Sequence, residues 1–204
     1  MGAAGTSTEQ IIHHYFSGVT IDAVTTTAWG TFVVESPTPM LVGLLQGVHS
    51  VLFTVETGRA QLCFDRGGIC VRSAEAGESY RFVPDGAGNC VFLFVAVGLP
   101  AQTLPHVGSC EGSVRALSAE AVLRIPFKAR SYKNGTLRFR PTPGSTGLHA
   151  VYEIGVDDYM RGLSEVPDTW PSAAIEAQVI VSRSLGVNTA LEIGDEGTMT
   201  SQRR

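Results

Sequence analysis

The sequence predicts an α+β fold, with a β-rich amino-terminal portion followed by further strands and a two-helix motif. Three observations lead to this prediction. Short aliphatic and aromatic runs alternate with turn residues from about 20 to 105, and the 23 glycines and 10 prolines favour short strands over long helices. A long helical pattern of apolar residues follows near the carboxyl end. With 44% hydrophobic and 17% charged residues, the chain can form a core.

The first half of the chain is expected to begin with one helix and continue as strands. Ile11, Ile12, Tyr15 and Phe16 recur at helical spacing, and Gly18 ends the pattern. The runs that follow have the composition of strands, at 31–35, 50–56, 60–64, 80–83 and 90–97. The clearest turn is the PDGAGN segment at 84–89.

A second unit is expected to begin near residue 121. Strands are predicted at 121–127, 136–141 and 149–156, with the turn pair Asn134-Gly135 before the second of them. A short helix at 157–161 and a long helix at about 171–186 follow, with Pro171 suited to the first helical position. Because the long helix is apolar on most sides, it is expected to be buried. We therefore divide the chain into a β-rich region, 1–120, and a second domain, 121–204, whose tail after 193 has no periodicity.

Charge and hydropathy exclude two classes of partner. The net charge is −4 and the longest basic run is the pair Arg203-Arg204, so the sequence has no electrostatic footprint for nucleic acid. The longest apolar run, 91–99, is too short for a membrane span, which needs about 20 residues. The first ten residues lack the features of a secretory signal, so we expect a cytoplasmic protein or a chain that begins downstream of its natural start.

The four cysteines leave two interpretations open. Cys63 and Cys70 bracket a plausible hairpin turn at 65–68, and with Cys90 and Cys110 they could form two disulfides in an oxidising compartment. Alternatively, all four are buried free thiols, because Cys is among the most buried residue types. No pair has the spacing of a zinc site. We expect neither a metal nor another cofactor.

The segment at 156–185, VDDYMRGLSEVPDTWPSAAIEAQVIVSRSL, carries a specific pattern in fixed order. Its members are Tyr159, Gly162, Glu165, Pro167, Trp170, Pro171, Ala177, Gln178, Arg183 and Ser184. This pattern resembles the signature region of the SpoIID/LytB family (stage II sporulation protein D, amidase enhancer). Residues 3–21 also resemble a segment that follows a Gly-His-Gly motif in related proteins, although the motif itself is absent here.

This sequence departs from the family pattern at three points. The loop between Gly162 and Glu165 is shorter than the commonest form, and Ala173 stands where many members have Glu. The chain also ends soon after the helix that carries Arg183, whereas the family domain continues. We therefore expect a partial SpoIID/LytB domain, an interior fragment of a longer reading frame.

The resemblance implies lytic transglycosylase activity on peptidoglycan, in the cell envelope or outside the cell. Glu165 would protonate the glycosidic oxygen, and its carboxylate would then accept a proton from the sugar's 6-hydroxyl as an anhydro ring closes. Burial against Val166 and Trp170 would raise the pKa of such an acid towards neutrality. Trp170, Gln178, Arg183 and Tyr159 would bind substrate. The expected partners are peptidoglycan glycan strands and, as a further candidate, a cell-wall amidase.

Structural interpretations of the same residues remain open. Glu165 could cap a helix or pair locally, Trp170 could fill core, and Arg183 could pair with Glu176. Asp157 and Asp158 are expected to cap a helix. His13 and His14 point about 100° apart on a helix and are expected at the surface. At the level of the whole chain, the alternatives are a non-catalytic wall-binding or amidase-modifying module, and a β-rich interaction domain.

Overall fold

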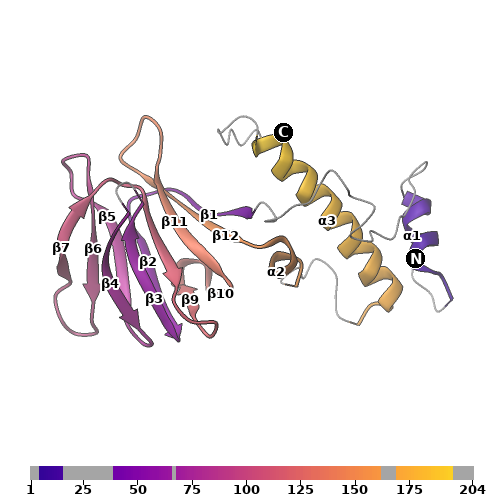
Figure 1. The fold of residues 1–204 in the computed structure, drawn as a ribbon, viewed down its shortest axis with the longest axis horizontal. Coiled ribbons are helices and arrows are strands. Elements are labelled where there is room, and N and C mark those ends of the chain that lie inside the picture. The colour runs from indigo at the N-terminus through magenta and orange to yellow at the C-terminus, as the bar shows by residue number, and fades with distance from the viewer. Residues whose placement is uncertain (1–4, 16–38, 66–67, 162–168, 195–204) are drawn as a thin grey trace. The chain divides into compact units, whose positions relative to one another are not determined.

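A computed structural model describes residues 5–15, 39–65, 68–161 and 169–194. The chain divides into two compact units (Figure 1). One unit contains Met1–Met40 together with Gly155–Arg204, and the other contains Leu41–Ile154. The central unit is therefore inserted between two segments that fold together.

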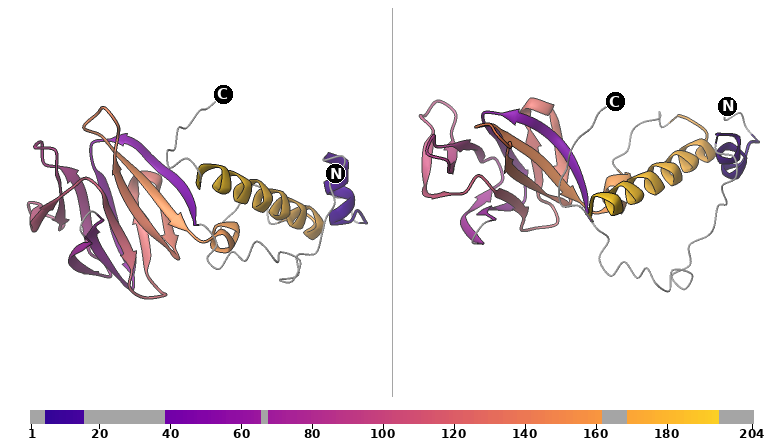
Figure 2. Two further views of the ribbon diagram at one scale, coloured as in Figure 1. Left: turned by 45° about the horizontal axis from the view of Figure 1, so that its top comes forward. Right: turned by 90° about the horizontal axis from the view of Figure 1, so that it is seen from above.

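The central unit is a sandwich of two sheets that face each other (Figures 1 and 2). The first sheet has the order β1-β12-β11-β8-β3-β4. Its strands are β1 (Met40–Val48), β12 (Leu148–Ile154), β11 (Gly135–Pro141), β8 (Gly112–Ala116), β3 (Arg59–Phe64) and β4 (Ile69–Glu75). The alternation of buried and exposed residues along β11 and β12 fits strands with one face on the core.

The second sheet has the order β10-β9-β2-β5-β6-β7. Its strands are β10 (Arg130–Lys133), β9 (Val122–Ile125), β2 (Val51–Thr57), β5 (Ser79–Pro84), β6 (Cys90–Val95) and β7 (Gln102–Gly108). A short 3₁₀ helix, η1 (Pro126–Lys128), connects β9 to β10. The pairings β2–β5, β5–β6 and β9–β10 are antiparallel.

Aromatic side chains fill the space between the sheets. Phe53, Tyr80, Phe82, Phe92 and Phe139 are all fully buried. The rings of Phe82, from the second sheet, and Phe139, from the first, stack with centroids 4.5 Å apart. These contacts join the sheets, because large aromatic surfaces contribute much of the free energy of burial.

The structure contains both disulfides of the oxidised alternative. Cys63 pairs with Cys70 across the β3–β4 hairpin, so the turn predicted between them is confirmed. Cys90, at the start of β6, pairs with Cys110, which follows β7. Cross-links of this kind stabilise a fold mainly by restricting the unfolded chain.

The α+β fold class is confirmed, and most of the predicted strands are present. The strand expected at 31–35 and the stop at Gly18 lie outside the described residues. The turn pair Asn134-Gly135 does not connect two strands of one sheet. The chain passes there from β10 in one sheet to β11 in the other. Asn134 has a φ of 62°, and a Cβ on Gly135 would lie 2.5 Å from the Glu153 carbonyl oxygen. The pair is a crossing point between the sheets rather than a hairpin turn.

The predicted division at residues 120 and 121 falls inside the sandwich, between β8 and β9. β9 pairs with β2, which lies far before the division, and β11 pairs with β8 across it. Strands from both sides therefore share both sheets. Single-strand patterns indicate where strands lie but not which strands pair, so the boundary could not be placed from them.

The other unit contains three helices among its described residues: α1 (Thr8–Tyr15), α2 (Val156–Arg161) and α3 (Ser172–Gly194). Both α1 and α2 contact α3. The prediction that α3 is buried holds for Ala174 and Ala177, whereas Ile180 is 37% exposed. Among the described residues, no helix is long and apolar enough to cross a membrane.

Candidate functional site

The predicted catalytic residue, Glu165, lies in the segment 162–168, outside the described residues. The elements on either side of this segment are described. α2 ends at Arg161, and α3 begins at Ser172. The role of Glu165 therefore stays a prediction, and the described residues on either side of it are considered in turn.

Tyr159 and Trp170 lie on the two sides of that segment. Tyr159 is partly buried in α2, where its N–H donates to the Gly155 carbonyl at 2.9 Å. Trp170 is 47% exposed, so the alternative interpretation that its side chain fills the core is wrong. A ring that is half open to solvent beside a loop is available to stack on a ligand.

Pro171 starts α3 from the position just before the first helical residue. Its carbonyl accepts hydrogen bonds from the N–H groups of Ala174 at 2.8 Å and Ile175 at 3.2 Å. The helix therefore begins one residue later than predicted, at Ser172, and continues to Gly194 rather than to 186. Pro171 needs no N–H donor there, because N–H groups at a helix start have no partner within the helix.

Gln178 and Arg183 both lie on α3. Gln178 is partly buried, and its Nε2 donates to Ser182 Oγ at 3.2 Å, one helical turn later. The side chain of Arg183 is outside the described part of the structure. At 100° per residue, the two backbone positions are about 140° apart around the helix.

Glu176 links α3 to the amino-terminal helix. Its Oε2 accepts a hydrogen bond from Thr8 Oγ1 at 2.7 Å, across 168 residues of sequence. Ile12 of α1 is buried, as are Ala174 and Ala177 of α3. The small alanine side chains allow a neighbouring helix to approach closely. The amino-terminal helix and α3 thus contact each other in one unit.

The other predicted features of these helices differ in outcome. Asp158 lies inside α2, where it accepts from Arg161 Nη1 at 2.7 Å, rather than at the position before the helix. Asp157 is likewise within α2. His13 and His14 are both exposed on α1, as predicted. His13 Nε2 lies 3.6 Å from Glu9 Oε1, one turn earlier.

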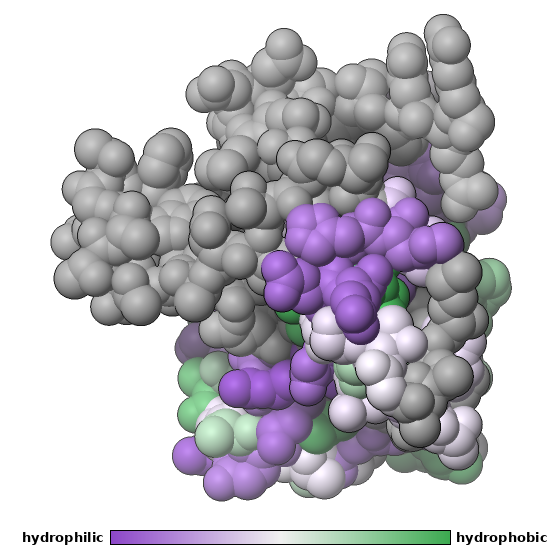
Figure 3. All heavy atoms as spheres, turned by 90° about the vertical axis from the view of Figure 1, so that its right-hand side faces the viewer, coloured by the Kyte–Doolittle hydropathy of each residue, from purple (hydrophilic) through white to green (hydrophobic). Residues whose placement is uncertain are grey.

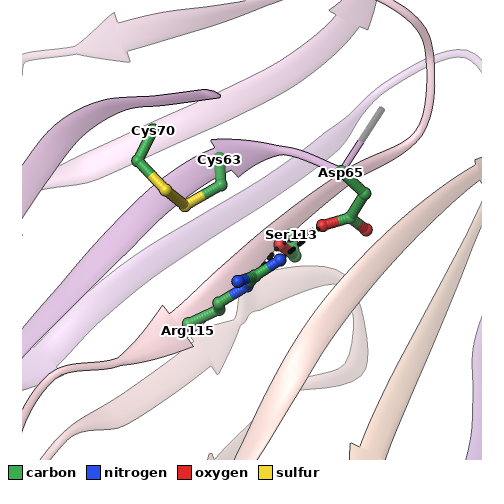
Figure 4. The surroundings of a disulfide bond; sticks show 5 residues. All are labelled: Cys63, Asp65, Cys70, Ser113 and Arg115. Carbon is green, nitrogen blue, oxygen red and sulfur yellow. Dashed lines mark hydrogen bonds and ion pairs between the residues drawn. A yellow bond between two sulfur atoms is a disulfide. The ribbon is translucent and has the colours of Figure 1, made fainter. Parts of the chain in front are cut away.

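The sandwich carries a charged cluster that no sequence motif indicated. Asp65 accepts hydrogen bonds from Ser113 Oγ at 2.6 Å and Arg115 Nη2 at 2.9 Å (Figure 4). It also accepts a hydrogen bond from Arg138 Nη1 at 3.1 Å. Arg138 also donates through Nε to Glu153. The hydrogen bond to Glu153 raises the pKa of Arg138, against the effect of burial, and Asp65 contributes in the same direction.

The strand register explains how this cluster forms. Ser113 and Arg115 are two residues apart on β8, and Arg138 on β11 lies opposite Ser113. All three therefore project from the outer face of the first sheet, beside the Cys63–Cys70 disulfide shown in Figure 4. Because each charge has an opposite partner, the cluster is suited to holding strands together.

A second cluster joins the two sheets. Tyr80 on β5 donates to Glu78 Oε2 at 2.7 Å and accepts from Arg72 Nε on β4 at 2.7 Å. Burial opposes ionisation of Glu78, but hydrogen bonds from the Glu75 N–H, Tyr80 and Arg72 lower its pKa overall. Burial and Glu78 raise the pKa of Tyr80, so the phenol is neutral at physiological pH.

The described residues were compared with the ligand sets that hold metal ions. Among the described residues, no group of three His, Cys, Asp or Glu side chains could hold a metal ion. The four cysteines are all in disulfides. In the space-filling view of Figure 3, a group of hydrophilic side chains lies beside hydrophobic ones on the described surface.

Comparison with known proteins found no matching family model, no matching curated protein and no matching solved structure. The resemblance to the SpoIID/LytB family therefore rests on the ten-residue pattern at 156–185 and stays a prediction.

Proposed function

We propose that this chain contributes to peptidoglycan glycan-strand cleavage by a lytic transglycosylase-type mechanism, with Glu165 as general acid and base. The observation that carries the proposal is the ordered pattern from Tyr159 to Ser184. Chance would rarely place ten matching residues in fixed order over about 30 positions, even with the shortened loop before Glu165.

The contact between α1 and α3 supports this proposal. Residues 156–185 resemble the SpoIID/LytB signature region and residues 3–21 resemble a segment of related proteins, and the sandwich separates the two in sequence. The Thr8–Glu176 hydrogen bond joins the described parts of these segments in a single unit. One domain interrupted by an insertion would require such a contact. Two unrelated segments would not.

The mechanism requires a single carboxyl group, unlike most glycoside hydrolysis, which uses two. The protonated Glu165 donates its proton to the glycosidic oxygen as the bond to the muramic acid anomeric carbon breaks. The Glu165 carboxylate then accepts the proton of that sugar's 6-hydroxyl, whose oxygen closes the anhydro ring. The acid is thereby regenerated and no water is consumed. Trp170, half exposed beside the loop, would stack on a sugar ring.

The two disulfides support a location in the cell envelope or outside the cell. Structural disulfides persist in oxidising compartments and are rare in a reducing cytoplasm. Both cross-links lie in the sandwich, which is bounded by Leu41 and Ile154. An envelope location would bring the chain to its proposed substrate.

Replacement of Glu165 by Gln tests the catalytic assignment. The chain would be incubated with purified glycan strands, and the products would be identified by mass spectrometry. We expect anhydromuramic ends from the parent, and none above background from Glu165→Gln, with wall binding retained. Glu111→Gln is a matched control, because Glu111 is exposed on the sandwich. Equal loss of cleavage and binding in Glu165→Gln would contradict the assignment.

A non-catalytic wall-binding or amidase-modifying module is the second candidate. The specific observation in its favour is the sandwich, which has its own aromatic core and two internal disulfides. An independent core is what a separate binding module needs. On this alternative, parent and Glu165→Gln would both bind wall material and both leave glycan strands intact.

A further inference from the structure

The connection between β9 and β10 exposes an aromatic side chain at the tip of a hairpin. Phe127 is 79% exposed at the centre of η1. A single exposed hydrophobic residue is ordinary on a protein surface. Phe127 differs because its turn is fixed and its neighbours are charged.

The backbone of this turn is held rigidly. Pro126 restricts its own φ, and the Ala129 N–H donates to the Pro126 carbonyl at 2.9 Å. Ala129 has a φ of 51°, in the left-handed region that costs a residue with a Cβ about 1–2 kcal/mol. Such strain in a surface turn, where glycine would relieve it, is a reason to look for a function. The turn therefore holds the backbone of Phe127 in place, which lowers the entropic cost of binding.

The charge around Phe127 is positive. Residues 124–133 contain four Lys and Arg residues and no Asp or Glu, in a chain with 15 basic and 19 acidic residues. Glu56 reaches this hairpin but is already occupied by Arg124 Nη1 at 3.2 Å and Ser131 Oγ at 2.5 Å. Glu120 interacts with Lys133, at the end of the hairpin away from the tip. Lys128 and Arg130 are exposed, and neither forms an ion pair with a described residue. The tip thus combines one apolar ring with two unneutralised cations.

We propose that this tip, Phe127 with Lys128 and Arg130, docks the sandwich on an anionic lipid bilayer surface. Phe127 enters the interface between headgroups and acyl chains, and the two cations contact lipid phosphates. Aromatic rings and basic side chains favour this region for separate reasons, burial of apolar area and attraction to the negative surface potential. A soluble phosphate polymer would explain the cations but would leave the exposed ring without a role.

The docking is expected to be weak and reversible. Two cations contribute about fivefold each to partitioning onto an anionic surface, and one ring adds about tenfold. This inference is independent of the lytic activity, because it concerns a different unit and a different partner. It gives the sandwich a role in holding the chain at an anionic membrane surface.

Vesicle flotation with the full chain tests the proposal. Vesicles of pure phosphatidylcholine and vesicles with about one third phosphatidylglycerol would be compared at low and at high salt. We expect binding to the anionic vesicles that weakens with salt. Phe127→Ala should lower the partition coefficient about tenfold. The double variant Lys128→Glu/Arg130→Glu should lower it at least about thirtyfold and remove most of the salt dependence.

Matched controls come from the rest of the sandwich. Val97 is fully exposed on the β6–β7 connection, and Arg81 is exposed on β5. Val97→Ala and Arg81→Glu should leave partitioning within about twofold of the parent, because neither residue belongs to the tip. Circular dichroism of each variant would show that it is folded.

A spectroscopic readout completes the test. Phe127→Trp should show a blue shift of fluorescence with anionic vesicles and quenching by brominated lipids, whereas Val97→Trp should show neither. Failure of the parent to bind anionic vesicles would overturn the proposal. Unchanged binding of the tip variants to anionic vesicles would also overturn it. So would binding of the parent to a soluble phosphate polymer in place of vesicles, if Phe127→Ala bound that polymer as well as the parent.

Discussion

Replacement of Asp65 by Ala should destabilise the sandwich by about 2–3 kcal/mol. Asp65 connects β3 to Ser113 and Arg115 on β8 and to Arg138 on β11. The change removes all three contacts and leaves Ser113, which is fully buried, without its acceptor. The disulfide beside it would remain, so the fold should persist.

The magnitude follows from exposure. The Arg115 side chain is 46% exposed, so its ion pair is screened and contributes about 0.5 kcal/mol. Arg138 is 27% exposed and Asp65 is 21% exposed, which gives their contact about 1 kcal/mol. The Ser113 O–H loses its acceptor, while its oxygen still accepts from Arg115 Nε at 3.1 Å, and this loss costs about 1 kcal/mol more. Asp65→Asn keeps an acceptor and should lose about half as much as Asp65→Ala.

Urea unfolding followed by circular dichroism measures this loss. Both tryptophans, Trp29 and Trp170, lie outside 41–154, so tryptophan fluorescence reports on the other unit and serves as an internal reference. Glu111→Gln controls for loss of one negative charge. If Asp65→Ala lowered the free energy of unfolding by less than about 0.5 kcal/mol, the reasoning would be refuted. The contacts of Asp65 would then contribute no more than a solvent-exposed ion pair.

Three further predictions concern the sandwich. The pKa of Glu78 is lowered from 4.5 in the folded protein, so its contribution to stability is complete above 4.5 and is lost as the pH falls through the folded-state pKa. Glu78→Gln should therefore flatten the acid side of the plot of unfolding free energy against pH. An unchanged slope would contradict this prediction. Ala129→Gly relieves a left-handed backbone at an entropic cost, so urea unfolding should show a gain of up to about 1 kcal/mol, and a clear loss would show that the strain is absent. Gly135→Ala places a Cβ 2.5 Å from the Glu153 carbonyl oxygen and from the Tyr152 ring, so it should destabilise by about 2 kcal/mol in the same assay, whereas a neutral result would mean that the crossing is loosely packed.

The sequence could predict single elements because their signals are local. Alternation of buried and exposed residues identifies β2 and β12 without knowledge of any partner. Pairing is not local. Asn134-Gly135 has the composition of a hairpin turn, but β10 pairs with β9 and β11 with β8 and β12, so the pair connects sheets instead. The boundary near 121 was misplaced for the same reason.

The candidate site was predictable only where a motif covered it. Tyr159, Trp170, Gln178 and Arg183 were selected by the resemblance, and among these four the structure describes the side chains of Tyr159, Trp170 and Gln178. The Asp65 cluster escaped prediction because its members come from three strands and from the turn after β3, and have no fixed spacing. The contact between Thr8 and Glu176 likewise depends on tertiary structure, which a single sequence does not reveal.

The most direct test of the proposed chemistry is glycan cleavage in water labelled with heavy oxygen. In the transglycosylase-type reaction, the sugar's own 6-hydroxyl supplies the new bond, so the muramic acid ends should carry no label and should be lighter than hydrolytic ends by one water. Unlabelled anhydro ends from the parent, absent with Glu165→Gln, are the result that we predict. Labelled reducing ends would mean hydrolysis and would contradict the single-carboxyl mechanism.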